Sequence, residues 1–329
     1  MGHKHKMVSP DKTPRCTISV DVDSIDSVLK FYGKKESGFN GKDPVYELAV
    51  PRFLKLFDER GIKATFFVVA SDCRKPATQK AVREIILKGH EVANHSLDHR
   101  FAFSLMPKSE KYKDIAESTQ LIKDTCGEAP VGFRVPGYDV DEETIEILDR
   151  MGYSYDSSLY KFPAYPLMRR ASYVNLDEVP KSRIFKNLPA EVFYSIFSPM
   201  EPYTPSQGRF WRKSAGRKIL EVPLSVVPFL GMPFNTTFLF LMGPGLFDFG
   251  LWSTRARGGN LNYNFHSTDM LSSGSDKLSL NHPGFRLGLE RKEEMFRDIL
   301  DKVKRYYEPV TLRSFCDGLR AQNMLRRPV

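Results

Sequence analysis

The chain has 329 residues, of which 41% are hydrophobic and 27% charged, and it carries a formal net charge of +9 at pH 7. This length can bury a full hydrophobic core, either as one large α/β barrel-like domain or as two smaller domains. The excess of Lys and Arg would suit an anionic partner, but no RNA- or DNA-binding motif is present, so we expect no nucleic-acid partner.

The cysteines and the N-terminal residues bear on where the protein works. The four cysteines are far apart and form no C-x-x-C pair, which argues for reduced thiols and against a disulfide framework or a thiolate zinc site. Residues 1–10 resemble an expression leader, so we leave their His residues out and expect the folded domain to span residues 11–329. No signal peptide is visible, although one could have been removed. We therefore expect a cytoplasmic protein, or one at the inner face of the membrane.

The first predicted strand covers residues 16–23 and ends in two carboxylates, Asp21 and Asp23. Because side chains alternate along a strand, both carboxylates point to the same side. Two carboxylates at the tip of an apolar strand repel each other unless a cation or a proton relieves that repulsion. This strand end is therefore a candidate for a charged site.

Helical and strand patterns then alternate along the chain. Helices are predicted over residues 45–60, 76–88, 111–126 and 141–151, and strands over 64–70, 90–93, 131–133 and 154–155. The run at 64–70 is apolar throughout, which is typical of a strand buried on both faces. Polar residues follow the strands, at the position where active sites lie in α/β barrels and doubly wound sheets.

The strand predicted over residues 90–93 is followed by Asn94-His95-Ser96-Leu97-Asp98-His99. Two imidazoles four residues apart, on a helical turn or a helix-like loop, can hold one divalent metal ion through neutral ring nitrogens. Two His residues do not complete a metal site, and Asp21 or Asp23 is the best candidate for the third ligand. Catalysis there would also need an open coordination position.

The second half of the chain is less regular. Residues around 162–220 predict an irregular insertion, rich in Pro, Tyr and Arg. Residues 222–247 carry no charged side chain, but four prolines argue against a membrane span. We interpret this stretch as a buried strand with an apolar loop, and an exposed lip that touches a membrane is the alternative. A strand over 261–266 ends in His266, and a charged amphipathic helix covers 287–307. A short strand and a helix close the chain.

Five predicted strand ends thus carry polar groups, and their order resembles the motifs of the polysaccharide deacetylase family (the NodB homology domain, carbohydrate esterase family four). The resemblance covers roughly residues 17–266. The first motif appears as Asp21-Val22-Asp23, in a D-x-D form, and the second, H-[ST]-x-x-H, is complete at residues 95–99. Arg134-Val135-Pro136 matches R-x-P. Asp156-Ser157-Ser158 is similar to the fourth motif, and Asn264-Phe265-His266 replaces the usual L-x-H.

The resemblance implies a distorted (β/α) barrel of about seven parallel strands with a long insertion. It also implies that Asp23, His95 and His99 hold a divalent metal ion and that Asp21 is the general base. Zinc is the expected ion, with cobalt, nickel or manganese as alternatives. Such a site leaves positions for water and substrate.

Elementary chemistry suggests roles for the other motif residues. Arg134 would pair with Asp21 and keep it ionised. His266, as imidazolium, would protonate the departing amine, with Asp156 orienting it. The Gly137 N–H could face the oxyanion, and Tyr138 would belong to the substrate site. Two further residues belong to the same prediction: Ser96, expected to hydrogen-bond within the metal loop, and Asn264, expected to make the acyl pocket more polar.

The leading hypothesis is a metal-dependent hydrolase that removes an N-acyl group, with acetyl expected and formyl an alternative, from an amino sugar of a glycan or glycan precursor. A lipid-linked sugar at the cytoplasmic membrane face is the alternative substrate, suggested by the uncharged stretch and by basic residues between 209 and 218. A hydrolase of small cyclic amides and a catalytically silent glycan-binding protein are the remaining alternatives. The oligomeric state is left open.

Overall fold

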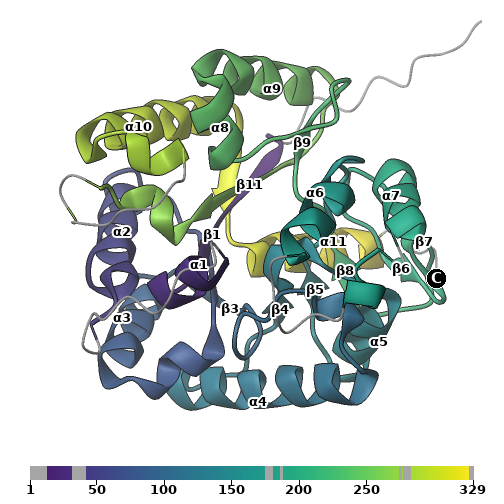
Figure 1. Cartoon of the computed structure of the whole chain (residues 1–329). Helices are drawn as coiled ribbons and strands as arrows, with labels where there is room; N and C mark the ends of the chain where they lie inside the picture. The colour runs from purple at the N-terminus through teal and green to yellow at the C-terminus, as the bar shows by residue number, and fades with distance from the viewer. Residues whose placement is uncertain are drawn as a thin grey trace, which may run out of the picture.

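The computed structural model describes residues 13–31, 42–174, 181–185, 188–273, 276 and 283–325. The expected leader, residues 1–10, lies outside these ranges. Parallel strands form one curved sheet surrounded by helices (Figure 1). The strands follow the order β11–β1–β2–β3–β4–β5–β8, and β12 pairs with the beginning of β1. They are β1 (Arg15–Val22), β2 (Thr65–Val68), β3 (Glu91–Asn94), β4 (Gly132–Phe133), β5 (Tyr155–Asp156), β8 (Leu220–Glu221), β11 (Leu261–His266) and β12 (Glu308–Val310).

This sheet confirms the predicted distorted barrel of about seven parallel strands. Its two end strands, β8 and β11, do not pair with each other, so the barrel is open on that side. The segment after β8 partly bridges the opening, because the Ser225 N–H donates to the Asn262 carbonyl of β11 at 3.1 Å. The helices that surround the barrel are α1 (Ile25–Phe31), α2 (Val50–Asp58), α3 (Pro76–Leu87), α4 (Lys108–Cys126), α5 (Glu142–Arg150), α10 (Leu289–Tyr306) and α11 (Leu312–Leu325).

Strand β1 divides its side chains between an apolar face and a polar face. The apolar residues Cys16, Ile18, Val20 and Val22 are buried in the main core together with side chains of α2 and α10. The alternate residues lie on the opposite face, where β1 runs parallel to β11 with Thr17 opposite Asn262, Ser19 opposite Asn264 and Asp21 opposite His266. The Thr17 hydroxyl donates to Asn262 Oδ1 at 3.0 Å and the Ser19 hydroxyl to Asn264 Oδ1 at 2.9 Å. The result is a buried polar ladder that leads to Asp21.

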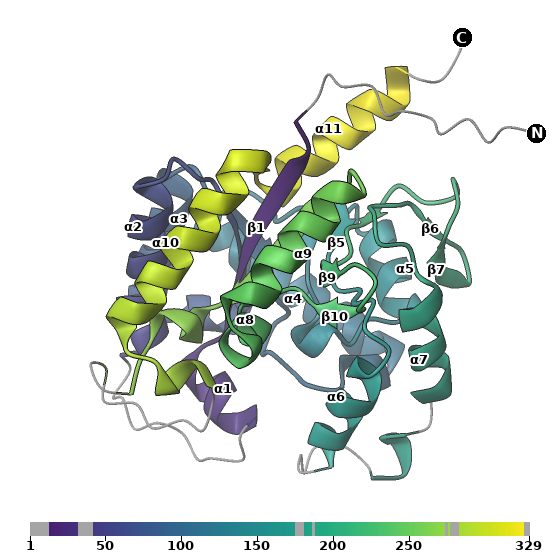
Figure 2. The ribbon, with the colours of Figure 1, turned by 90° about the horizontal axis from the view of Figure 1, so that it is seen from above.

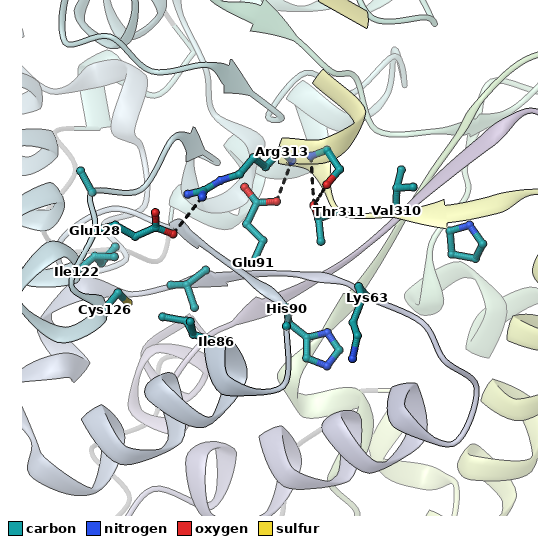
Figure 3. Close-up of a pocket in the computed structure, with 15 residues that line it drawn as sticks. Lys63, Ile86, His90, Glu91, Ile122, Cys126, Glu128, Val310, Thr311 and Arg313 are labelled. Atoms are coloured by element: carbon teal, nitrogen blue, oxygen red, sulfur yellow. Dashed lines mark hydrogen bonds and ion pairs between the residues drawn. The ribbon is translucent and has the colours of Figure 1, made fainter. Parts of the chain in front are cut away.

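The two ends of the barrel differ in what covers them. Figure 2 shows α11 at the end where β1 begins and α1 at the end where β1 finishes. At the α11 end, a cavity of about 410 Å³ is lined by Glu91 and by residues of α3, α4, β12 and the start of α11 (Figure 3). Glu91 accepts hydrogen bonds from the Thr65 hydroxyl (2.7 Å), the Tyr155 hydroxyl (2.8 Å) and the Arg313 N–H (2.9 Å). One carboxylate therefore joins β2, β3 and β5 to the first turn of α11.

The insertion is more regular than its sequence suggested. It contains α6 (Tyr165–Tyr173), α7 (Leu188–Phe197) and a hairpin of β6 (Pro205–Ser206) with β7 (Arg209–Lys213). Arg169 and Arg170 on α6 both pair with Glu191 on α7, and Arg169 also pairs with Asp139 of the barrel at 2.8 Å. The helical repeat of apolar residues is weak in this part of the sequence, because these helices are fixed in place by buried ion pairs in addition to an apolar stripe.

Residues 222–247 are also more helical than expected. The hairpin of β9 (Val226–Val227) and β10 (Met232–Pro233) is followed by α8 (Thr236–Met242) and by α9 (Pro244–Ala256), whose first residues belong to this stretch. Asn235 caps α8 by accepting from the Phe238 N–H, and Pro244 begins α9, so Asn and Pro start helices here instead of interrupting one. Within the described residues, no helix combines the length and apolar character needed to cross a bilayer.

Candidate metal centre and active site

The predicted site residues gather at the end of the barrel where the parallel strands finish. Asp21 and Asp23 come from the end of β1, His95 follows β3, Arg134 follows β4 and His266 ends β11. The strand order places β11 directly beside β1, and β2 and β3 follow on its other side. Carboxyl ends of parallel strands share one edge of a sheet, so residues distant in sequence converge there.

Asp23, His95 and His99 form the convergent group that the sequence predicted. The Nε2 atoms of His95 and His99 lie 3.3 and 3.1 Å from the same Asp23 oxygen, Oδ1. The ligand atoms of the three residues all lie within 4.8 Å of one another. Among the described residues, this is the group of His, Cys, Asp or Glu side chains that could hold a metal ion.

The environment of this group favours positive charge. Burial alone would raise the pKa of Asp23, but the charge of His99 and hydrogen bonds from His95 and His99 outweigh it and hold that pKa well below its usual range. Burial would lower the pKa of His95, yet the hydrogen bond to Asp23 and the charges of Asp21 and Asp23 raise it. One carboxylate and two imidazoles suit a divalent ion such as zinc and leave further coordination positions free.

His95 is also oriented for metal binding. Its Nδ1 lies 2.8 Å from the Arg134 carbonyl oxygen, which can only accept a hydrogen bond. In the neutral ring that can bind a metal ion, the proton is therefore on Nδ1, and the Nε2 lone pair faces Asp23 and His99.

The residues between the two imidazoles form a tight loop and not a helical turn. Ser96 and His99 have φ values of 69° and 50°, in the left-handed region. The Ser96 hydroxyl accepts a hydrogen bond from the His99 N–H at 3.1 Å, which is a hydrogen bond within the loop of the kind expected for Ser96. The Leu97 N–H donates to Asp114 Oδ1 on α4 at 2.9 Å. Hydrogen bonds from both sides thus stabilise a strained loop that brings the two rings together.

Arg134 and Asp21 form the buried ion pair expected from the sequence. Arg134 Nη1 lies 2.6 Å from Asp21 Oδ1, and the two side chains are 0% and 2% exposed. Arg134 also donates to the Ser19 hydroxyl, to Asn264 Oδ1, and to the carbonyl and hydroxyl oxygens of Ser157. Burial would raise the pKa of Asp21, but the charges of Arg134, His95 and His266 outweigh burial and lower it. Asp21 is therefore an ionised, fixed acceptor.

The second oxygen of Asp21 faces Tyr138, Asn264 and His266. Asp21 Oδ2 lies 3.1 Å from the Tyr138 hydroxyl and 3.1 Å from Asn264 Nδ2, and His266 Nε2 is 3.9 Å away. The sequence assigned Tyr138 to the substrate site and Asn264 to the acyl pocket. In the structure, the Tyr138 hydroxyl and the Asn264 amide both belong to the hydrogen-bond network of Asp21. The period of two along β11, which places Asn264 on the same side as His266, is the signal that could have revealed this.

Gly137 and Tyr138 occupy an unusual turn beside this network. Both residues have positive φ, 60° for Gly137 and 54° for Tyr138. Arg169 of α6 donates to the Tyr138 carbonyl at 2.8 Å, and the Tyr165 hydroxyl donates to the Gly137 carbonyl at 3.3 Å. The insertion therefore fixes the backbone of the R-x-P-G-Y segment.

The expected contact between Asp156 and His266 is not present. The Asp156 carboxylate accepts from the Ser158 N–H (3.1 Å) and hydroxyl (2.8 Å), and burial raises its pKa to about 6 next to Glu221. The residue that contacts His266 is Asp269, whose carboxylate accepts from the His266 N–H at 2.8 Å. In return, the His266 side chain accepts from the Asp269 N–H. Asp269 lies in a short turn directly after β11, whereas β5 lies several strands away.

Comparison with known proteins supports the resemblance seen in the sequence. Residues 42–155 match the family model described as polysaccharide deacetylase. A peptidoglycan deacetylase of Helicobacter pylori is 32% identical over 142 residues, which is 43% of this chain and 47% of the relative. A peptidoglycan-N-acetylglucosamine deacetylase of Bacillus cereus is 28% identical over 115 residues, 35% of this chain and 50% of the relative. The matches thus span about half the length of these curated relatives.

Solved structures share the fold over almost the whole chain. A candidate polysaccharide deacetylase from Mycobacterium smegmatis superposes with a TM-score of 0.63 at 19% identity, covering 98% of this chain and 96% of that one. Puue allantoinase superposes with a TM-score of 0.59 at 14% identity, covering 93% of this chain and 90% of that one. At these identities the likeness establishes the fold alone.

Proposed function

Because this chain is related to the polysaccharide deacetylase family, we propose that it is a metal-dependent hydrolase that removes an N-acyl group, with acetyl expected, from an amino sugar of a glycan. One observation carries the proposal. The Asp23–His95–His99 group lies beside an ionised Asp21 that is fixed by Arg134, with His266 on the neighbouring strand. The relatives named above are deacetylases of peptidoglycan, which supports a glycan substrate.

The side chains of this site can perform the steps of amide hydrolysis. A divalent ion held by Asp23, His95 and His99 would polarise the acyl carbonyl and acidify a water molecule. Asp21 accepts the proton of the attacking water, because Arg134 keeps its carboxylate ionised. His266, held by the hydrogen bond from its backbone N–H to Asp269, would protonate the departing amine once its ring has taken up a second proton as imidazolium.

The backbone of the R-x-P-G-Y segment completes the proposal. We assign the oxyanion contact to the Gly137 N–H, because Gly137 lies between Arg134 and Tyr138, which both contact Asp21. Arg169 and Tyr165 take no part in proton transfer; they donate hydrogen bonds to the Tyr138 and Gly137 carbonyls and so fix this turn. The insertion thereby becomes one wall of the substrate site.

The test is release of free amine from N-acetylated chitooligosaccharides and peptidoglycan fragments. Protein stripped with a chelator should be inactive and should recover activity with zinc, cobalt, nickel or manganese. Equal activity of stripped and reloaded protein would refute the proposal. D21N should abolish turnover and leave metal binding largely intact, whereas D298N, at an exposed ion pair on α10, should behave as wild type. Glycan binding without turnover in metal-loaded wild type would identify a silent binding protein, and turnover of cyclic amides alone would identify the other hydrolase class.

A second candidate substrate is a lipid-linked amino sugar at a membrane surface. Exposed large apolar side chains gather on the β9–β10 turn, α8 and α9, which Figure 2 shows on one side of the molecule. Phe229 is 83% exposed at the tip of the turn and Trp252 is 60% exposed on α9. Aromatic side chains in this position suit the interfacial region of a bilayer. Flotation of the wild type with anionic vesicles, and its loss in F229S/W252S, would support this substrate; absence of wild-type flotation would exclude it.

A further inference from the structure

Asn264 occupies the last step of the polar ladder before Asp21 and is completely buried. The sequence predicted a polar acyl pocket at this position, and the amide forms hydrogen bonds with four polar side chains of the barrel interior. Its Oδ1 lies 2.8 Å from Arg134 Nη1 and 2.9 Å from the Ser19 hydroxyl. Its Nδ2 lies 2.8 Å from the Tyr138 hydroxyl and 3.1 Å from Asp21 Oδ2.

The donors around Asn264 determine which way its amide points. A guanidinium has only donors, so the atom that meets Arg134 must be the oxygen of the Asn264 amide. Ser19 receives a hydrogen bond from Arg134 and passes its own proton to the same oxygen. The NH₂ group therefore faces Tyr138 and Asp21 and gives one proton to each.

This orientation in turn determines where the Tyr138 hydroxyl sends its single proton. Tyr138 accepts from Asn264, and its second neighbour, His266 Nε2, lies 3.3 Å away. Because the His266 side chain accepts from the Asp269 N–H through one ring nitrogen, the ring proton is on the other, Nε2. With two donors directed at it, the Tyr138 hydroxyl can donate only to Asp21 Oδ2, at 3.1 Å. Burial and the charge of Asp21 raise the pKa of Tyr138 well above its usual value, so the hydroxyl stays protonated.

We propose that Asn264 is a positioning residue that sets the direction of a hydrogen-bond chain from His266 through Tyr138 to Asp21. This hydrogen-bond chain holds the Asp21 carboxylate in one orientation between the ladder and the metal ligands. It also directs His266 Nε2 at the Tyr138 hydroxyl, which donates to Asp21. The effect on turnover rests on the proposed function, in which Asp21 accepts the proton of water. The direction of the chain is a property of the folded protein and does not depend on the reaction.

The test compares substitutions at two steps of the same ladder. N264D keeps the shape of the side chain but presents an acceptor to Tyr138 and Asp21, so the Tyr138 proton is drawn to the new carboxylate. N262D introduces the same charge two residues earlier, where Asn262 contacts Thr17, Ser157 and the Val222 and Pro223 carbonyls and does not contact Asp21. N264L and N262L form a second, uncharged pair in case either aspartate prevents folding.

We expect kcat on N-acetylated chitooligosaccharide to fall about 100-fold in N264D, the order expected when a catalytic group is displaced, with KM and zinc affinity within about threefold of wild type. N262D and N262L should retain wild-type kcat when each variant and the wild type are assayed at the same interval below their own melting temperatures. The double variant N264L/Y138F should lose no more kcat than the more severe single variant, because both residues act through one chain. Additive losses, or a wild-type kcat in N264D, would overturn the proposal.

A measurement without substrate separates this proposal from the proposed function. In the wild type, the side-chain NH₂ resonances of Asn264 should be protected from solvent exchange, and Y138F should shift one of them strongly. If the wild type releases no amine from any substrate, the proposed function fails. The NH₂ spectrum of Asn264 then tests the hydrogen-bond chain from His266 to Asp21 by itself. Rapidly exchanging resonances, or resonances unaffected by Y138F, would refute the chain even in an active enzyme.

Discussion

Replacement of Arg134 by Met should destabilise the folded protein severely, because it removes the partner of a buried charge. Asp21 is 2% exposed and receives its shortest contact, 2.6 Å, from Arg134. Breaking a buried ion pair by removing one partner costs about 3–5 kcal/mol. The loss of a donor to the Ser157 carbonyl adds about 1 kcal/mol or more. Since a whole domain is stable by about 5–15 kcal/mol, R134M should lose about a quarter or more of that free energy.

The matched experiment is a double-mutant cycle measured by urea unfolding at pH 7 with a chelator present, so that metal binding does not contribute. D21N removes the charge but keeps the shape of Asp21, and R134M/D21N contains neither charge. We expect the double variant to be no less stable than R134M, with a coupling free energy near the upper end of the usual range of about 0.5–3 kcal/mol. A loss below about 1 kcal/mol in R134M, or strictly additive losses, would mean that Asp21 does not depend on Arg134.

Three further predictions concern pH, the opposite end of the barrel and the metal. Burial raises the pKa of Asp114 from 3.8 to about 7, so the folded state binds its proton more tightly than the unfolded state and stability falls between about pH 4 and 7. D114N keeps an acceptor for the Leu97 N–H, so the unfolding free energy of this variant should no longer fall between about pH 4 and 7. If its slope against pH equals that of the wild type, Asp114 is not the group responsible. E91Q places an NH₂ group next to the donors that the Glu91 carboxylate accepts from. We expect its free energy of unfolding to fall by about 1–3 kcal/mol and hydrogen exchange in α11 to become faster. Exchange rates equal to those of the wild type would show that Glu91 does not stabilise that helix. Zinc at 100 times its Kd should stabilise the wild type by about 2.7 kcal/mol, and H99A should abolish this effect at the same concentration, which calorimetry or thermal unfolding can measure.

The parts of the site that the sequence predicted depend on local rules. The period of two along β1 put Asp21 and Asp23 on one side, and the His95–His99 spacing indicated two metal ligands. The rule that polar groups follow strands in α/β folds placed Arg134 correctly next to Asp21. The same rule misplaced the contact of Asp156, because it gives the end of the barrel on which a residue lies but not its partner.

The parts that were missed depend on contacts between distant segments. Asn264 meets Ser19 through a strand pairing that joins residues 245 positions apart, and no local pattern gives that register. Asp269 lies in a short turn after β11, where periodicity carries no information. The helices of the insertion were missed because Arg169 and Arg170 are buried in ion pairs, although charged residues in a sequence usually indicate a solvated face.

The polar ladder explains how a charged site can be built inside a barrel. Each inward-facing polar residue of β1 has a polar partner directly opposite on β11, so Thr17 and Ser19 satisfy Asn262 and Asn264 before the charged residues begin. A buried network stabilises one structure only when its donors and acceptors are matched throughout. Arg134, which can only donate, fixes the direction of the last steps, and Asp21, which accepts when ionised, ends them. A substitution that reverses one of these last steps, at Asn264, should therefore affect the reacting end of the network even where it leaves the packing of the barrel unchanged.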